Sequence, residues 1–255
     1  MNNKLFIGDN LSIMRSLPYE SVDLIATDPP FMSQRNYGEF NDKWSSIKEF
    51  IEFMKLRLIE MYRLLKPTGS IYLHLDQSSS HYMKMEMDQI FHVNNFQNDI
   101  IWSYNSGGGT IRRFGRKHDN ILFYSKTDNH IFHADNVRVP YPHDYGDKIP
   151  TNPKGKVASD VIININRLSN SAKERNGYPT QKPVKLYKWL INASSNEGDL
   201  VLDPFVGSGT SLDAAQSLNR NWIGIDQNPN TISYIKKRFD KYGLLQPKYE
   251  VIHAN

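Results

Sequence analysis

The chain has 255 residues, of which 39% are hydrophobic, so it is long enough for one catalytic core with a small inserted module and short of two full domains. Its formal charge of +4 favours a polyanionic partner. It contains no cysteine, which excludes a disulfide framework, a thiolate zinc site and a cysteine nucleophile.

Apolar strands and amphipathic helices alternate along most of the chain. The spacing of apolar residues predicts strands at 5–8, 22–27, 70–75, 99–104 and 120–124, and helices at 11–17 and 47–65. Between residues 134 and 176 prolines interrupt the pattern, which predicts an insertion. The alternation then returns with a helix at 184–193, a strand at 200–202, a helix to about 218 and a strand at 221–225. This order predicts an α/β fold with a largely parallel sheet.

A tetrad, Asp28-Pro29-Pro30-Phe31, follows the strand at 22–27. It is compatible with a simple proline turn. It also suits methyl transfer to an exocyclic amine, whose lone pair is delocalised into the ring and whose protons must be held by acceptors. The Asp28 carboxylate and a backbone carbonyl supply two acceptors, and Phe31 supplies a face on which an extruded base can stack.

A glycine loop, Asp203-Pro204-Phe205-Val206-Gly207-Ser208-Gly209-Thr210, follows the strand at 200–202. Its glycines allow close approach of the backbone to a ligand, and Asp226 at the tip of the next strand suits ribose hydroxyls. A dinucleotide fingerprint would need a glycine where Leu212 stands, and a P-loop would need a lysine where Thr210 stands. A nucleoside cofactor without a pyrophosphate therefore fits better, although a glycine turn that merely connects strand and helix is the alternative.

Together, these two segments resemble the β class of DNA amino-methyltransferases of bacterial restriction–modification systems, which use S-adenosylmethionine (AdoMet). The tetrad resembles their D/N/S-P-P-Y/F/W motif, and the glycine loop resembles their AdoMet motif in the permuted order of that class. The resemblance implies a circularly permuted Rossmann-like AdoMet methyltransferase fold with an inserted target-recognition segment. Residues 1–133 would then carry the catalytic half, residues 134–176 target recognition, and residues 177–255 the AdoMet-binding half.

The resemblance also assigns site residues. Gly8-Asp9-Asn10 is similar to a family motif that faces the AdoMet adenine, although Asp9 also suits a helix cap. The segment from Tyr178 to Pro183 is similar to the family's H-P-T-Q-K-P segment, with Tyr178 in place of the histidine. The implied catalytic residues are Asp28, Pro29, Pro30 and Phe31. The implied cofactor-binding residues are Asp9, Asn10, Asp28, Thr180, Lys182, Asp203, Phe205, Gly207, Ser208, Gly209, Thr210 and Asp226.

DNA contacts are expected from the segment 106–118, which combines glycines at 107–109 with a cluster of basic residues and no acidic residue. The expected DNA-binding residues are Arg112, Arg113, Arg116 and Lys117, with Tyr37 helping to position a flipped base. A solvated basic loop is the alternative.

The resulting prediction is a site-specific enzyme that methylates adenine N6 in duplex DNA after base flipping. Asp as the first tetrad residue favours adenine, because Ser is commoner in the family's cytosine enzymes. The alternatives are a cytosine N4 methyltransferase, an RNA methyltransferase and a non-catalytic AdoMet-binding module. The resemblance adds a homodimer and a cognate restriction endonuclease as expected partners. The histidines show no metal-ligand spacing, so no metal is expected. With neither a signal peptide nor a membrane-spanning run in the sequence, we expect a soluble, cytoplasmic protein that does not bind membranes.

Overall fold

A mostly parallel β-sheet forms the centre of the computed structural model, which describes residues 3–105, 109, 111–141 and 152–254. Within these residues the strand order is β11-β1-β10-β9-β2-β5-β7-β6-β8. The strands are β1 (Asn3–Ile7), β2 (Val22–Thr27), β5 (Leu65–Leu75), β6 (Phe96–Ser103), β7 (His118–Ser125), β8 (Val161–Ile162), β9 (Leu200–Asp203), β10 (Asn221–Asp226) and β11 (Tyr249–His253). A separate hairpin pairs β3 (Arg35–Asn36) with β4 (Asn41–Asp42).

Pairing is parallel from β11 to β5, whereas β7 runs antiparallel to both of its neighbours, β5 and β6. The short edge strand β8 lies parallel to β6. The predicted α/β fold with a largely parallel sheet is therefore confirmed.

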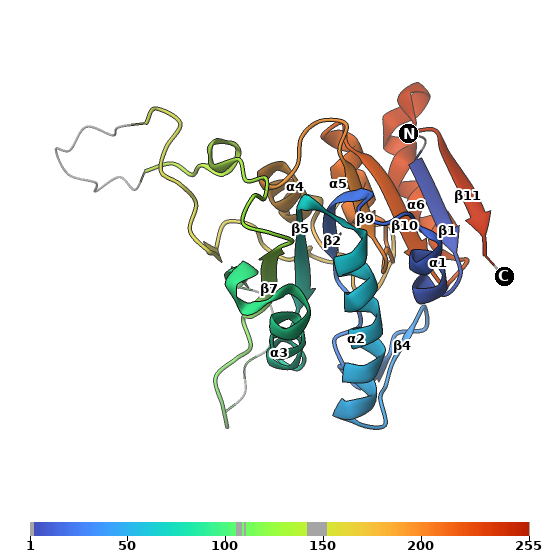
Figure 1. Ribbon diagram of the computed structural model, residues 1–255, viewed down its shortest axis with the longest axis horizontal. Helices are drawn as coiled ribbons and strands as arrows, with labels where there is room; N and C mark the ends of the chain where they lie inside the picture. The colour runs from blue at the N-terminus through green and yellow to red at the C-terminus, as the bar shows by residue number, and fades with distance from the viewer. Residues whose placement is uncertain (1–2, 106–108, 110, 142–151, 255) are drawn as a thin grey trace.

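Helices cover both faces of the sheet (Figure 1). One face carries α1 (Asn10–Ser16), α2 (Ile47–Leu64) and α3 (Ser80–Phe91), and the other carries α4 (Val184–Ala193), α5 (Thr210–Ser217) and α6 (Thr231–Phe239). Short 3-10 helices are η1 (Val93–Asn95), η2 (Ala134–Val137) and η3 (Asp240–Leu245). Each helical layer packs on the sheet through its own apolar cluster. Among the described residues, no helix has the length and apolarity needed to cross a bilayer.

Helix α2 shows how the local sequence sets these elements. Its N-terminus is capped by Ser46, whose Oγ accepts a hydrogen bond from Glu49 N at 3.1 Å. Phe50, Met54 and Leu58 follow at helical spacing and are fully buried. The predicted strand at 70–75 starts too late. Strand β5 begins directly at Leu65, and an irregular register against β2 accommodates the proline and glycine.

Further elements escaped the sequence prediction, among them α3, α6, β8 and β11. The apolar spacing of α3 was present in the sequence, because Met83, Met87 and Phe91 recur every four residues and are fully buried. The two edge strands carry too little local signal, since β8 has two residues and depends on pairing with β6.

The predicted insertion, residues 134–176, begins with η2 and an antiparallel bridge between Val139 and Lys156. Its later part contacts the core, where Trp102 Nε1 donates to the Ile165 carbonyl at 2.6 Å. Figure 1 shows its yellow-green ends reaching out beyond the sheet. Residues 142–151, like Gly107 and Gly108 of the predicted DNA-contacting loop, lie outside the described residues.

The chain leaves β2 and β9 in opposite directions although the two strands are neighbours. From β2 it proceeds through α2 to β5 on one side, and from β9 it proceeds through α5 to β10 on the other. In open parallel sheets, ligands bind in the crevice that such a reversal leaves at the carboxyl ends of the strands. The tetrad follows β2 and the glycine loop follows β9, so both lie at this crevice.

Candidate active site

A pocket opens at this crevice, with about 980 Å³ of empty space when open solvent at its mouth is included. Most of the predicted site residues line it. They are Asn10, Asp28, Pro29, Pro30, Phe31, Tyr37, Thr180, Lys182, Asp203, Phe205, Gly207, Ser208, Thr210 and Asp226. Asp9 and Gly209 adjoin it without lining it, and the basic residues at 112–117 lie elsewhere.

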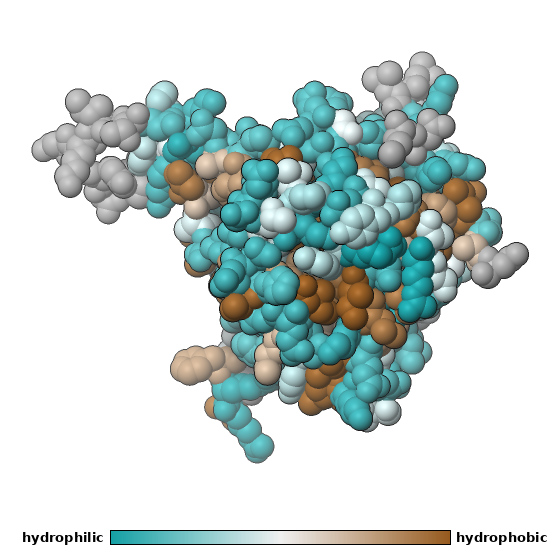
Figure 2. Space-filling model, in the orientation of Figure 1, coloured by the Kyte–Doolittle hydropathy of each residue, from teal (hydrophilic) through white to brown (hydrophobic). Residues whose placement is uncertain are grey.

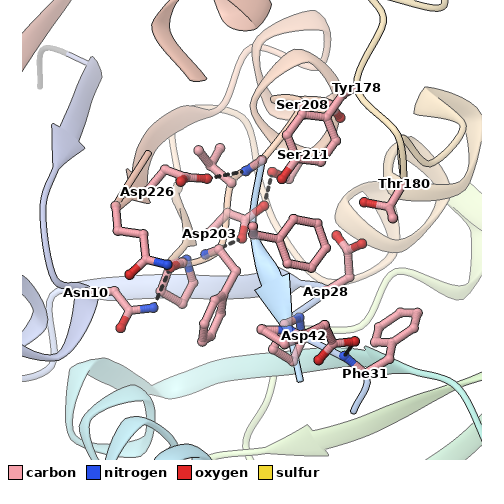
Figure 3. A pocket seen from close by; sticks show the side chains of 18 of the residues that line it. Asn10, Asp28, Phe31, Asp42, Tyr178, Thr180, Asp203, Ser208, Ser211 and Asp226 are labelled. Atoms are coloured by element: carbon pink, nitrogen blue, oxygen red, sulfur yellow. Dashed lines mark hydrogen bonds between the residues drawn. The ribbon is translucent and has the colours of Figure 1, made fainter. Parts of the chain in front are cut away.

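Asp203, at the end of β9, connects the glycine loop to β2, the strand that the tetrad follows. Its carboxylate accepts hydrogen bonds from Thr27 Oγ1 at 2.6 Å, from Phe205 N at 3.0 Å and from Ser211 Oγ (Figure 3). Burial raises the pKa of Asp203 to about 7, and the negative charge of Asp28 adds to the rise. This carboxyl therefore binds a proton far more readily than an exposed one.

The glycine loop adopts a backbone that its glycines make possible. Gly207 and Gly209 have φ of 46° and 76°, a region that residues with a side chain rarely enter. A Cβ on Gly209 would lie 2.8 Å from Cγ1 of Ile235 in α6, so the loop also needs glycine for close packing. Gly207 N donates to Asp226 Oδ2 at 2.8 Å, which ties the loop to the tip of β10.

The tetrad carboxylate, Asp28, is held by two donors from a distant part of the chain. Lys182 Nζ lies 2.5 Å from Oδ2, and the Tyr187 hydroxyl donates to Oδ1 at 3.0 Å. The Lys182 ammonium also lies 4.5 Å from the centroid of the Phe31 ring. Burial raises the pKa of Tyr187 well above its usual value, so this hydroxyl stays protonated and acts as a donor. Sequence reasoning missed Tyr187, because on an amphipathic helix it looks like an ordinary core residue.

Asp42 fixes the loop that carries the tetrad. It is buried, and its carboxylate accepts backbone N–H groups of Phe31, Met32 and Ser33 at 3.2, 2.9 and 2.8 Å. Trp44 Nε1 adds a fourth donor at 3.0 Å. Ionised acceptors make stronger hydrogen bonds than neutral ones, so this carboxylate holds the backbone after Pro30 in one conformation. Sequence reasoning missed Asp42 because its surroundings, Asn41 to Ser46, look like a polar surface turn.

Aromatic rings and one carboxylate close the pocket on the side of the β3–β4 hairpin. Tyr37 stacks on Phe40 with centroids 4.9 Å apart, and Phe40 faces Tyr178 at 6.3 Å. Glu39, at the tip of the hairpin, accepts hydrogen bonds from the Tyr234 hydroxyl at 2.7 Å and from Asn228 Nδ2 at 2.8 Å. The hairpin is thereby fastened to the segment that follows β10. Tyr178, the departure from the family's histidine, contributes a ring to the wall.

Asn10 links the start of α1 to the glycine loop. Its Nδ2 donates to the Pro204 carbonyl at 2.8 Å, and its Oδ1 accepts from Arg57 Nε at 2.7 Å. Asp9 caps α1 by accepting from Ser12 N at 2.9 Å, and it pairs with Arg57 at 3.0 Å. Asp9 therefore caps α1, and Gly8 and Asn10 are the members of this motif that line the pocket.

Behind Phe31, a buried network runs to the base of the segment 104–118. The His74 ring lies 5.7 Å from the Phe31 ring, and His74 Nε2 contacts Asp119 Oδ2 at 3.1 Å. The Tyr104 hydroxyl donates to the other oxygen of Asp119 at 2.8 Å. Burial lowers the pKa of His74, so its imidazole is neutral near pH 7 and its Nε2–H donates to the carboxylate. The segment carrying Arg112, Arg113, Arg116 and Lys117 leaves the sheet from this network.

We expect Asp203→Asn to remove a pH-dependent loss of stability. The pKa of Asp203 is about 7 when folded and 3.8 without the protein environment, so between those values only the folded state holds this proton. The wild-type free energy of unfolding therefore falls through this window as the pH rises, and the variant lacks that fall. Urea unfolding at about pH 5 and about pH 8 measures the free energy of unfolding of both proteins, and the value for the variant minus the value for the wild type should rise with pH. A value of this difference that stays the same at both pH values would contradict the prediction. Asp135→Asn, at an exposed carboxylate, is the control.

Comparison with known proteins identifies a family. Residues 22–237 match the DNA methylase family N6_N4_Mtase. The chain is 37% identical over 243 residues to the type II methyltransferase M.HpaI of Haemophilus parainfluenzae, covering 94% of this chain and 75% of the relative. It is 31% identical over 252 residues to the DNA adenine methyltransferase YhdJ of Escherichia coli strain K12, covering 91% of this chain and 81% of that protein.

Solved structures share the fold. The cytosine-N4-specific PvuII DNA methyltransferase has a TM-score of 0.74 at 19% identity, covering 99% of this chain and 95% of the other. The complex of M1.HpyAVI with AdoMet has a TM-score of 0.65 at 24% identity, covering 92% of this chain and 98% of the other. These similarities confirm the predicted AdoMet methyltransferase fold. The family match over residues 22–237, together with the similarity to M.HpaI, shows that the chain belongs to the DNA amino-methyltransferases, which act on adenine N6 or cytosine N4.

Proposed function

We propose that the protein transfers a methyl group from AdoMet to N6 of an adenine that is flipped out of duplex DNA. The observation that carries this proposal is the position of Asp28. Its carboxylate lines the pocket and lies against Lys182 and Tyr187, and the glycine loop lines the same pocket. An acceptor for an amine and a nucleoside-binding loop therefore share one cavity.

The residues around the glycine loop fit AdoMet, the methyl donor of the family to which the chain belongs. The loop backbone at Gly207 approaches the cavity without a side chain in the way, and Asp226 beside it suits ribose hydroxyls. We infer that Asn10 and Phe205 flank the adenine and that Thr180 and Lys182 contact the methionine end. AdoMet supplies a methyl group made electrophilic by its sulfonium.

The tetrad then prepares the amine. Asp28 and the Pro29 carbonyl accept the two N–H groups of the base, which directs the nitrogen lone pair toward the methyl carbon. With AdoMet bound, the nitrogen would take the methyl group from the sulfonium, and the proton released from the nitrogen would pass to the Asp28 carboxylate and on to solvent. Phe31 stacks on the base, with His74 supporting its ring from behind. Lys182 and Tyr187 fix the orientation of Asp28 through the hydrogen bonds already present.

Adenine is favoured over cytosine by two observations. The first residue of the tetrad is Asp, and the chain is 31% identical to a DNA adenine methyltransferase. The second candidate function is cytosine N4 methylation, which the structural similarity to the PvuII enzyme supports. Both reactions need an amine, two acceptors and a stacking face.

Target recognition belongs, in our proposal, to residues 134–176, between a catalytic half at 1–133 and an AdoMet-binding half at 177–255. Arg112, Arg113, Arg116 and Lys117 would contact phosphates, and Tyr37 would help to hold the flipped base. On the family resemblance alone, we also propose a homodimer and a cognate restriction endonuclease as partners.

Product analysis tests the proposed function directly. The purified protein is incubated with AdoMet and unmethylated genomic DNA, the DNA is digested, and the nucleosides are identified by mass spectrometry. We expect N6-methyladenine. N4-methylcytosine would support the second candidate, and methylation of RNA in place of DNA, or of neither, would overturn the proposal.

Asp28→Ala should lower the methylation rate by at least about 100-fold, because the amine loses its carboxylate acceptor. AdoMet affinity, measured by calorimetry, should stay near that of the wild type. Asp128→Ala removes an exposed carboxylate far from the pocket and should retain full activity. Full activity of Asp28→Ala would contradict the assigned role.

Asp42→Asn should lower kcat by about 10-fold or more while the KM for DNA changes little, because an amide cannot accept all the N–H groups that now orient the tetrad loop. AdoMet affinity and the unfolding midpoint are measured beside it. A variant that loses stability without a change in kcat would show that Asp42 has only a structural role. Asp128→Asn, at an exposed carboxylate that does not line the pocket, serves as the control.

A further inference from the structure

Two large apolar side chains stand fully in solvent on the segment between β6 and β7. Ile111 and Phe114 are 103% and 98% exposed, and the next such side chain among the described residues, Ile163, is 72% exposed. Each exposed side chain of this size forgoes the free energy that burial would give. Two of them on one short projecting segment therefore indicate a surface that a partner covers.

The residues around this pair indicate which partner that is. Basic side chains flank the two apolar ones in the sequence: Arg112 and Arg113 lie between Ile111 and Phe114, and Arg116 and Lys117 follow. Residues 105–118 include no acidic side chain. A protein partner would bury this density of positive charge at a high cost. Duplex DNA offers the complementary arrangement, because its phosphates are outside and its apolar base stack lies between them.

The segment projects from the edge of the sheet that carries the tetrad. Strand β7 runs antiparallel to β5, with Asn120 paired to Leu75, so the start of β7 lies at the carboxyl end of β5. Figure 1 shows residues 111–117 as a green projection below β7, and in Figure 2 this projection carries teal and pale brown side chains together. Burial raises the pKa of Asp76, just after β5, and the positive charge of Arg116 opposes that rise, so Arg116 lies near enough to this edge to act on Asp76.

The base of the segment is joined rigidly to the pocket. Tyr104 N donates to the Lys117 carbonyl at 2.9 Å, which closes the segment where it leaves the sheet. The Tyr104 hydroxyl then contacts Asp119, which is bonded to His74, and the His74 ring lies against Phe31. An apolar tip and a base-stacking ring are thus held by one buried network.

We propose that Phe114, with Ile111 beside it, inserts into the base stack and fills the space that the target base leaves when it enters the pocket. This inference rests on the proposed function. Unstacking a base is costly, and an aromatic ring that takes its place stacks on the neighbouring pairs and lowers that cost. The arginines supply affinity for any duplex, whereas Phe114 acts on the flipping step alone.

The test uses the full chain with Phe114→Ala, Ile111→Ala and the double variant. Met85→Ala is the control, because Met85 is 66% exposed on α3 and lies outside the segment. The target sequence is first mapped by sequencing DNA that the wild type has methylated. Two duplexes are then made, one with 2-aminopurine at the target position, or next to it if the target is a cytosine, and one with an abasic site opposite the target.

We expect Phe114→Ala to bind the duplex within about threefold of the wild type, because the phosphate contacts persist. Its 2-aminopurine fluorescence rise should be largely lost, and kcat on the intact duplex should fall by about 10-fold or more. On the duplex with the abasic site, where the target base has no pairing partner and leaves the helix at lower cost, kcat should return toward the wild-type value. Ile111→Ala should show a smaller loss of the same kind.

Two results would overturn the proposal. One is a wild-type fluorescence rise in Phe114→Ala and in the double variant. The other is an equal loss of kcat on both duplexes, which would indicate a defect unrelated to base flipping. Failure of the proposed function is recognised separately, because the wild type itself would then methylate no DNA and no target would be mapped.

Discussion

The parallel pairing of β2 with β9, sealed by the hydrogen bond from Thr27 Oγ1 to Asp203 Oδ1, is the contact on which the site depends. These two residues are 176 positions apart in the chain. The tetrad follows one strand and the glycine loop follows the other, so the pocket exists only where their carboxyl ends meet. Hydrogen bonds from Lys182 and Tyr187 to Asp28 add a second connection between the tetrad and the C-terminal half of the chain.

The charge of the pocket is consistent with the proposed donor. Four carboxylates and two cations line it: Asp28, Asp42, Asp203 and Asp226, with Lys182, which is paired with Asp28, and Arg57. Burial raises the pKa of Asp203 and of Asp226, which is the response of carboxylates that have too little positive charge nearby. A ligand that carries a positive sulfonium supplies such charge, whereas a dinucleotide pyrophosphate would be repelled.

Sequence reasoning recovered the parts of this molecule that local chemistry determines. The α/β order, helix α2 and both motifs follow from apolar spacing and short segments, and most of the predicted site residues line one pocket. The supporting groups could not be recovered in this way. Asp42 sits in a polar turn and Tyr187 on an amphipathic helix, and each acquires its role only from tertiary partners. Strand β8 likewise has no local signal and exists through its pairing with β6.

The place of β1 in the sheet has a consequence for how the chain folds during synthesis. This strand lies between β10 and β11, both of which follow it in the chain by more than 200 residues. Its pairing therefore closes loops of more than 200 residues, and contacts of such separation form slowly. Until β10 and β11 have been synthesised, both edges of β1 lack their partners, and an unpaired apolar strand is prone to aggregation. Pairing of β1 therefore waits for two strands that are made much later than β1 itself.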